Sequence, residues 1–207
     1  SQRLTYQALA DAVNALADQL EDTKKLAYLA ETGAAAPVAM FAAALRGIPY
    51  VPINYRLAED QIKALLKRVS PALLISDDAP EVEGISLISP AQVFSPGTPW
   101  DGFAPDEEGG VAIELFTSGT TGDPKSAILR HDNLMAYILG TIEFMSAEET
   151  QSTLVSVPPY HIAGISAILS SVYAGRRMVQ LPNFSPEAWL KLAIQENVSQ
   201  AFLVPTM

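Results

Sequence analysis

The 207-residue chain contains no cysteine. This absence excludes a disulfide-stabilised scaffold and any zinc site built on thiolates, and it suits a reducing compartment, so we expect a cytoplasmic protein. Long hydrophobic runs are missing as well. The longest one, from Ala34 to Leu45, is too short to cross a bilayer, and we expect no transmembrane segment.

Positive charge is scarce. Lys and Arg number 13 against 23 Asp and Glu, which gives a net charge of −10 and argues against a nucleic-acid partner. Ten of the acids, and no Lys or Arg, lie between Ser70 and Pro124. The rest of the chain is neutral, with 13 acids (23 − 10) against 13 bases, and the first cation after the acidic stretch is Lys125.

Hydrophobic spacing alternates between the helical and the strand period, which predicts an α/β fold with mostly parallel sheets flanked by helices. The acidic, proline-containing segment 77–110 is expected to be a loop-rich connection between subdomains, with a brief strand. Ser185 before Pro186 predicts a capped helix start. We expect helices near 9–20, 35–45, 62–69, 132–145, 161–174 and 186–195, and strands at 25–30, 50–53, 72–75, 85–88, 111–116, 126–129, 153–157, 178–181 and 201–204.

A segment of small hydroxylated residues and glycine follows the strand 111–116. It reads Thr117-Ser118-Gly119-Thr120-Thr121-Gly122-Asp123-Pro124-Lys125. Glycines let successive backbone N–H groups converge on an anion, Thr and Ser add hydroxyl donors, and Lys125 adds a point charge. In an α/β sheet, ligands bind beyond the carboxyl ends of strands. The segment therefore predicts a polyphosphate-binding loop.

Two other interpretations of this segment are weaker. Gly119 to Ser126 nearly fits the P-loop pattern, but Pro124 stands where that pattern has a glycine N–H, and residues 126–129 indicate a strand where a P-loop opens a helix. A flexible Ser/Thr/Gly linker would seldom lie between two apolar strands or end in Pro-Lys.

These residues resemble the acyl-adenylate-forming enzymes, a superfamily that includes acyl-CoA synthetases, peptide-synthetase adenylation domains and luciferases. The signature T-S-G-T-T-G-x-P-K is complete at Thr117–Lys125. Four further segments resemble family segments in the family's order, so that the likeness extends along nearly the whole chain: Leu4–Tyr6, Tyr50–Asn54, His131–Leu134 and Pro159–Gly164. Two neighbouring positions depart from the pattern, since Ser126 stands where Gly is usual and Arg130 where Thr is common.

The resemblance implies an ATP-dependent activation of a carboxylic acid to acyl-AMP, followed by thioester formation with CoA. It assigns the phosphates of ATP, with Mg²⁺, to Thr117, Ser118, Gly119, Thr120, Thr121, Gly122 and Lys125. Lys125 and His161 are the expected catalytic residues, and Tyr160, His161 and Gly164 the expected walls of the acyl pocket. A histidine at a helix start is otherwise more often a cap or a packing residue. Two His without a third ligand give no protein-borne metal site, and His131 is expected to be structural.

The later motifs of the family have no counterpart here, so we expect residues 1–207 to be the N-terminal portion of an AMP-binding domain, inactive alone. The His-containing form of Pro159–Gly164 favours a CoA ligase acting on a fatty or aryl acid over an amino-acid adenylation domain of a peptide synthetase. Two other classes stay open: a P-loop-like nucleotide hydrolase, and a non-catalytic interaction module that would leave the loop unexplained.

Overall fold

The computed structural model describes residues 3–97, 109–117 and 124–203, and it divides into two compact units. The first unit holds residues 1–30 and 34–132, and the second holds 31–33 and 133–207. Among the described residues no helix is long and apolar enough to cross a membrane. The predicted connection at 77–110 includes undescribed residues, and its role as a subdomain boundary stays a prediction.

The first unit is built on a six-stranded sheet in the order β4-β3-β1-β2-β5-β6. All neighbouring strands are parallel except β5 and β6, which are antiparallel. This confirms the predicted mostly parallel α/β class. The strands are β1 (Leu26–Tyr28), β2 (Tyr50–Pro52), β3 (Ala72–Ile75), β4 (Ile85–Ile88), β5 (Val111–Thr117) and β6 (Lys125–Arg130).

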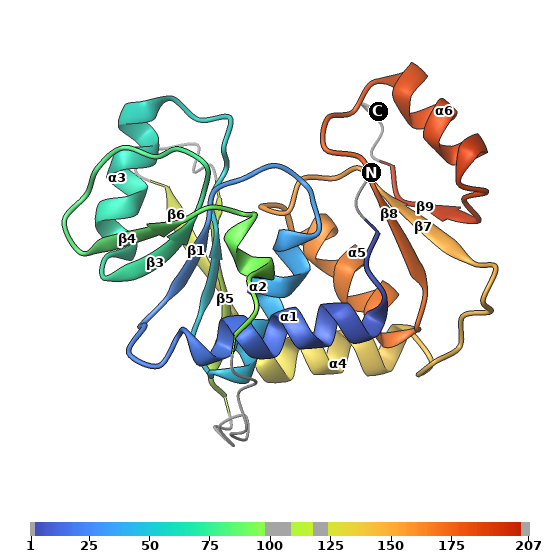
Figure 1. Cartoon of the computed structure of the whole chain (residues 1–207), viewed down its shortest axis with the longest axis horizontal. Coiled ribbons are helices and arrows are strands. Elements are labelled where there is room, and N and C mark those ends of the chain that lie inside the picture. The colour runs from blue at the N-terminus through green and yellow to red at the C-terminus, as the bar shows by residue number, and fades with distance from the viewer. Residues whose placement is uncertain (1–2, 98–108, 118–123, 204–207) are drawn as a thin grey trace. The chain divides into compact units, whose positions relative to one another are not determined.

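Helices cover both faces of this sheet because the chain reverses its direction of winding after β2. It passes from β1 through α2 (Ala35–Leu45) to the neighbouring β2, and then through α3 (Glu59–Val69) back across β1 to β3. Right-handed crossovers in opposite directions place their helices on opposite faces. Figure 1 shows α3 on one side of the sheet and α2, with α1 (Tyr6–Asp18), on the other. A short 3-10 helix, Gln92–Phe94, was not predicted.

Burial and helix capping explain two of the segments that resemble the family. Tyr50, Val51 and Ile53 are at most 1% exposed, since β2 lies in the middle of the sheet. Thr5 is the N-cap of α1, where its hydroxyl accepts a 3.0 Å hydrogen bond from the N–H of Ala8. The segments 50–54 and 4–6 therefore serve the fold.

The second unit has a parallel sheet in the order β8-β7-β9, formed by β8 (Arg177–Gln180), β7 (Ser152–Val155) and β9 (Gln200–Ala201). Helix α6 (Pro186–Gln195) packs on it through Trp189 and Leu192, and α5 (Ile162–Tyr173) contacts β7 and β8. Ser185 caps α6 by accepting from the N–H of Ala188 at 3.1 Å, with Pro186 at the first turn, which confirms the predicted cap.

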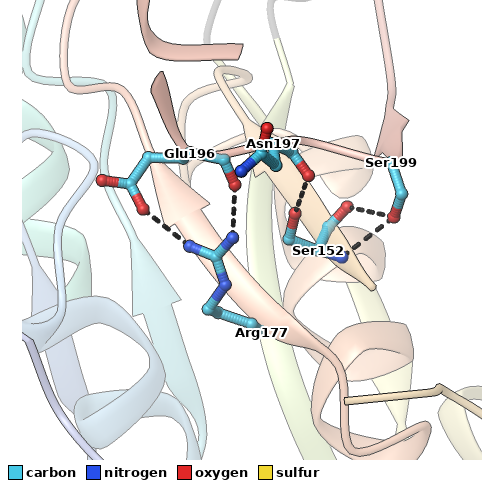
Figure 2. Close-up of polar contacts among 5 residues, drawn as sticks. All are labelled: Ser152, Arg177, Glu196, Asn197 and Ser199. Atoms are coloured by element: carbon cyan, nitrogen blue, oxygen red, sulfur yellow. Dashed lines mark hydrogen bonds and ion pairs between the residues drawn. The ribbon is translucent and has the colours of Figure 1, made fainter. Parts of the chain in front are cut away.

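Polar contacts attach residues 196–199, which connect α6 to β9, to strands β7 and β8. Figure 2 shows the Ser199 hydroxyl accepting from the N–H of Ser152 at 2.9 Å and donating to its carbonyl at 3.0 Å. The Ser152 hydroxyl donates to the carbonyl of Asn197, and Arg177 of β8 pairs with both the carboxylate and the carbonyl of Glu196. This network fixes where α6 ends.

Helix α4 (His131–Thr141) is shorter than the predicted helix 132–145. The Ile142 N–H still donates to the carbonyl of Ile138 in α4, but two later N–H groups turn to another helix: Met145 donates to the carbonyl of Tyr173, and Ala147 to that of Ala174, both at 3.0 Å. These carbonyls belong to the C-terminal end of α5, where they have no partner within that helix. The end of α4 is therefore set by a contact distant in sequence.

Candidate functional site

The predicted phosphate loop joins the two strands of the β5–β6 hairpin. Thr117, the last residue of β5, pairs with Lys125, the first residue of β6, and the Thr117 hydroxyl donates to the Lys125 carbonyl at 3.3 Å. Ser118, Gly119, Thr120, Thr121 and Gly122 lie outside the described residues. The structure thus brings the two ends of the predicted loop together at one rung of the sheet, with the Lys125 side chain exposed.

This arrangement excludes two of the alternatives. The residues after Lys125 form strand β6, so the helix that a P-loop requires is absent from the described residues 124–130, and the P-loop interpretation is wrong. A flexible linker would join separate domains, whereas Thr117 and Lys125, on either side of this segment, pair with each other in one sheet.

The hairpin is tied to the rest of its sheet by a carboxylate. Glu114 of β5 accepts from Lys25 Nζ at 2.7 Å through one oxygen and from the Ser126 hydroxyl at 3.1 Å through the other. The Glu114 side chain is 15% exposed, so this pair is shielded from water more than a surface salt bridge is. Ser126, one of the two departures from the family pattern, therefore has a structural partner.

The other departure, Arg130, ends β6. Its Nη1 donates to the carbonyl of Gly109, just before β5, and the next residue, His131, begins α4 with its N–H donating to the carbonyl of Gly110 at 3.1 Å. Arg130 and His131 both close the end of the hairpin opposite the loop.

A second group of predicted site residues surrounds the start of α5. His161 is the N-cap of that helix: its N–H donates to the carbonyl of Pro158 at 3.1 Å, and its carbonyl accepts from Gly164 and Ile165. Within the described first turn the imidazole makes no capping hydrogen bond. It is exposed and lies 4.6 Å, between ring centroids, from the buried ring of Tyr160.

Gly164 has a packing reason to be glycine. A Cβ at this position would lie 2.4 Å from the carbonyl oxygen of Pro158 and 3.0 Å from that of Val157. Helix α5 can approach the preceding segment this closely only without a side chain there. This accounts for Gly164 without a ligand, and its place in an acyl pocket stays a prediction.

The two groups of candidate residues belong to different units: Thr117 and Lys125 to the first, and Tyr160, His161 and Gly164 to the second. Among the described residues no cluster of three or more His, Asp or Glu side chains could hold a metal ion. The catalytic and binding roles assigned to all these residues stay predictions.

Sequence reasoning missed one residue beside the loop, Arg68 of α3. Its Nη1 donates to the Pro124 carbonyl at 2.5 Å, and its Cζ lies 5.2 Å from the ring centroid of Phe116. One signal could have pointed to it: Arg68 is the last cation before the acidic stretch that ends at Lys125.

A largely parallel α/β sheet that ends in an antiparallel hairpin, with a hydroxyl- and glycine-rich segment between the hairpin strands, is an architecture distinct from that of P-loop proteins. The family model for AMP-binding enzymes matches residues 1–207. The chain belongs to the AMP-binding enzyme family.

Curated relatives carry the names of CoA ligases. A feruloyl-CoA synthase of an Amycolatopsis species is 29% identical over 220 aligned residues, which cover 99% of this chain and 44% of the relative. A 2-succinylbenzoate–CoA ligase of Bacillus mycoides is 25% identical, over 88% of this chain and 39% of that protein. The chain thus spans less than half the length of these relatives.

Solved structures share the fold. The o-succinylbenzoate CoA synthetase of Bacillus subtilis, in complex with its acyl-adenylate intermediate, matches with a TM-score of 0.81 at 24% identity, over 100% of this chain and 57% of that one. The N-terminal subdomain of Klebsiella oxytoca NpsA matches with a TM-score of 0.80 at 25% identity, over 98% and 55% of the two chains.

Proposed function

We propose that the protein to which these residues belong is an AMP-forming acid–CoA ligase. The observation that carries the proposal is the complete Thr117–Lys125 signature, joining two paired strands in a member of the AMP-binding enzyme family. Relatives named as CoA ligases along nearly the whole chain support the second half-reaction.

The proposed reaction has two displacements. A carboxylate oxygen of the acid attacks the α-phosphorus of ATP, the bond from that phosphorus to the bridging α–β oxygen breaks, and pyrophosphate leaves. The CoA thiol then gives up its proton to solvent, its sulfur attacks the acyl carbon of acyl-AMP, and AMP leaves with the bonding electrons of the acyl–oxygen bond. The first step joins an anion to a polyanion, so donors and cations on the phosphates are its main requirement.

We assign the phosphates of ATP to Thr117, Ser118–Gly122 and Lys125. Lys125 is the first residue of β6 and pairs with Thr117, so it lies where both ends of the loop meet. Its side chain is exposed and is available to an anion there. Mg²⁺ would enter with ATP and neutralise phosphate charge, since the described residues offer no acidic cluster to hold it alone. CoA is the proposed co-substrate.

His161 and Tyr160 are the residues we assign to the acid. The two rings lie against each other at the start of α5, one exposed and one buried, as expected for an edge of a pocket with one polar side chain. The names of both curated relatives refer to aromatic acids, and on this ground we propose an aryl acid as substrate, with a fatty acid as the alternative.

The test is acid-dependent ATP–pyrophosphate exchange by the full-length protein without CoA, with aryl, fatty and amino acids in separate reactions. We expect exchange with aryl acids and, when CoA is added, the corresponding thioester and AMP. Exchange with fatty acids alone would correct the substrate class, and exchange with amino acids alone would indicate a peptide-synthetase type of activity. Release of ADP and phosphate without exchange would refute the adenylation mechanism.

A further inference from the structure

Lys125 is held by contacts on both of its peptide groups. On its C-terminal side, the Thr117 hydroxyl donates to the Lys125 carbonyl at 3.3 Å. On its N-terminal side, Arg68 Nη1 donates to the Pro124 carbonyl at 2.5 Å. The Pro124 carbonyl and the Lys125 N–H lie in one planar peptide group, so a donor fixed on that carbonyl also restricts the orientation of the Lys125 backbone. Proline adds a fixed φ just before this peptide.

Arg68 is itself anchored on the strand that enters the loop. Its guanidinium lies 5.2 Å from the ring centroid of Phe116, within the range of a cation–π contact. Phe116 in turn packs against the buried cluster formed by α3 and the strands, which includes Leu65 and Leu66. The Arg68 guanidinium therefore contacts Phe116, before the loop, and Pro124, near its end. The helix that carries Arg68 is itself packed in the core.

The contact between Arg68 and Pro124 joins residues that are far apart in the sequence, so it does not follow from chain connectivity. Arg68 and Pro124 are 56 positions apart, and between Arg68 and Lys125 the sequence has ten acids and no other cation. Arg68 also lies in the last turn of α3, where the helix dipole favours a cation without any partner. Lys67 occupies the same turn and carries the same charge, yet only Arg68 contacts the hairpin among the described residues.

We propose that Arg68 is a positioning residue for Lys125: it fixes the Pro124–Lys125 peptide, so that the lysine ammonium is held ready for the phosphates of ATP. The proposal rests on the proposed function, in which Lys125 binds those phosphates. Arg68 does not touch the ligand in this role and acts through Lys125.

The kinetic test is a double-mutant cycle in the full-length protein, with Arg68→Met, Lys125→Met and the double variant, and with Lys67→Met as the matched control. Methionine keeps the aliphatic stem and removes the charge and the donor groups. We expect Arg68→Met to lower kcat/KM for ATP in the exchange reaction about tenfold, as for loss of one charged hydrogen bond, with KM for the acid unchanged. In the Lys125→Met background the same change should cost less than about twofold.

Equal losses from Arg68→Met in the two backgrounds would overturn the proposal, because Arg68 would then act independently of Lys125. A loss of the same size in Lys67→Met would also overturn it, since charge near the end of α3 would suffice. A parallel loss for ATP and acid would indicate a general structural defect and would have the same consequence.

A second measurement does not depend on activity. Amide hydrogen exchange over the peptide 116–126 should be faster in Arg68→Met than in the unaltered protein, with Lys67→Met unchanged. If no acid supports pyrophosphate exchange, the proposed function fails, and this measurement still decides whether Arg68 holds the hairpin. Unchanged amide exchange in Arg68→Met would refute the positioning role whatever the enzyme activity.

Discussion

The hydroxyl of Ser126 donates a 3.1 Å hydrogen bond to the carboxylate of Glu114, across the two strands of the β5–β6 hairpin. The second carboxylate oxygen of Glu114 accepts from Lys25, just before β1. One side chain on β5 therefore ties β6, the edge strand of the described sheet, to the beginning of a strand in its middle.

Ser126→Ala should lower the free energy of unfolding by about 1 kcal/mol, because Glu114 loses one of its two donors while it stays partly buried. Ser126→Gly should cost more, since glycine also weakens a strand. Urea denaturation followed by circular dichroism measures both. The matched control is Ser86→Ala: Ser86 is exposed on β4 and its hydroxyl has no hydrogen bond to the described residues. Equal effects at the two positions would show that the Glu114 contact contributes nothing.

Two glycines in the second unit should respond to alanine with opposite signs. A Cβ at Gly164 would meet the backbone oxygen of Pro158 at 2.4 Å, so Gly164→Ala should destabilise the protein by about 2 kcal/mol or more. Gly140 lies in α4 with nothing within 4 Å of an added Cβ, and Gly140→Ala should stabilise by about 0.5–1 kcal/mol. Thermal unfolding of both variants measures these two changes in stability. A neutral Gly164→Ala would mean that α5 can move away from the preceding segment.

Burial raises the pKa of the Tyr50 hydroxyl well above its ordinary value of 10.0, and Tyr28 adds to this effect. The folded state thus binds the proton more tightly than the unfolded chain does. The contribution to stability is full below pH 10.0 and is lost as the pH rises from there toward the folded pKa. Stability should therefore fall steeply in alkali, and Tyr50→Phe should make that decline shallower.

At neutral pH, Tyr50→Phe should leave stability unchanged or raise it by up to about 1 kcal/mol, because the buried hydroxyl has no hydrogen-bond partner among the described residues. Denaturation curves at pH 7 and in alkali test both expectations. A clear loss of stability at neutral pH would show that this hydroxyl has a partner, for example an ordered water.

Ser199→Ala should destabilise the second unit by about 1–3 kcal/mol, since the N–H of Ser152, a residue that is 0% exposed, would lose its acceptor (Figure 2). Ser146→Ala is the control, because Ser146 is exposed and its hydroxyl makes no hydrogen bond to the described residues. Amide exchange at Ser152 gives a local readout: protection that survives Ser199→Ala would indicate that another group accepts this hydrogen bond.

Regular elements were predictable because their signals are local. The spacing of Leu9, Val13 and Leu16 gave α1, and Ser185 with Pro186 gave the start of α6. The end of α4 was not predictable, because Met145 and Ala147 leave the helix for carbonyls of α5 that lie about thirty positions away in the sequence. A local pattern carries no information about such a partner.

Of the candidate site, only the surroundings of the predicted loop can be compared with the structure. The two ends of the segment Thr117–Lys125 meet because the flanking apolar runs pair, as their strand-like pattern predicted, and the binding role of the segment stays a prediction. The contacts around it could not be predicted: Glu114 and Arg68 lie on a strand and a helix whose patterns indicate only structure, and their partners are distant in the sequence. Ionic and hydrogen-bonding roles of this kind depend on packing in three dimensions.

The pairing of Thr117 with Lys125 has a consequence for how the protein can change over evolution. Side chains alternate between the faces of a strand, so a one-residue slip of β6 against β5 would move the lysine to the opposite face of the sheet. Residues added to or removed from the connecting segment leave that register intact as long as the final rung still forms. The face that carries the cation is therefore set by the pairing of β5 with β6 and not by the residues between the two strands.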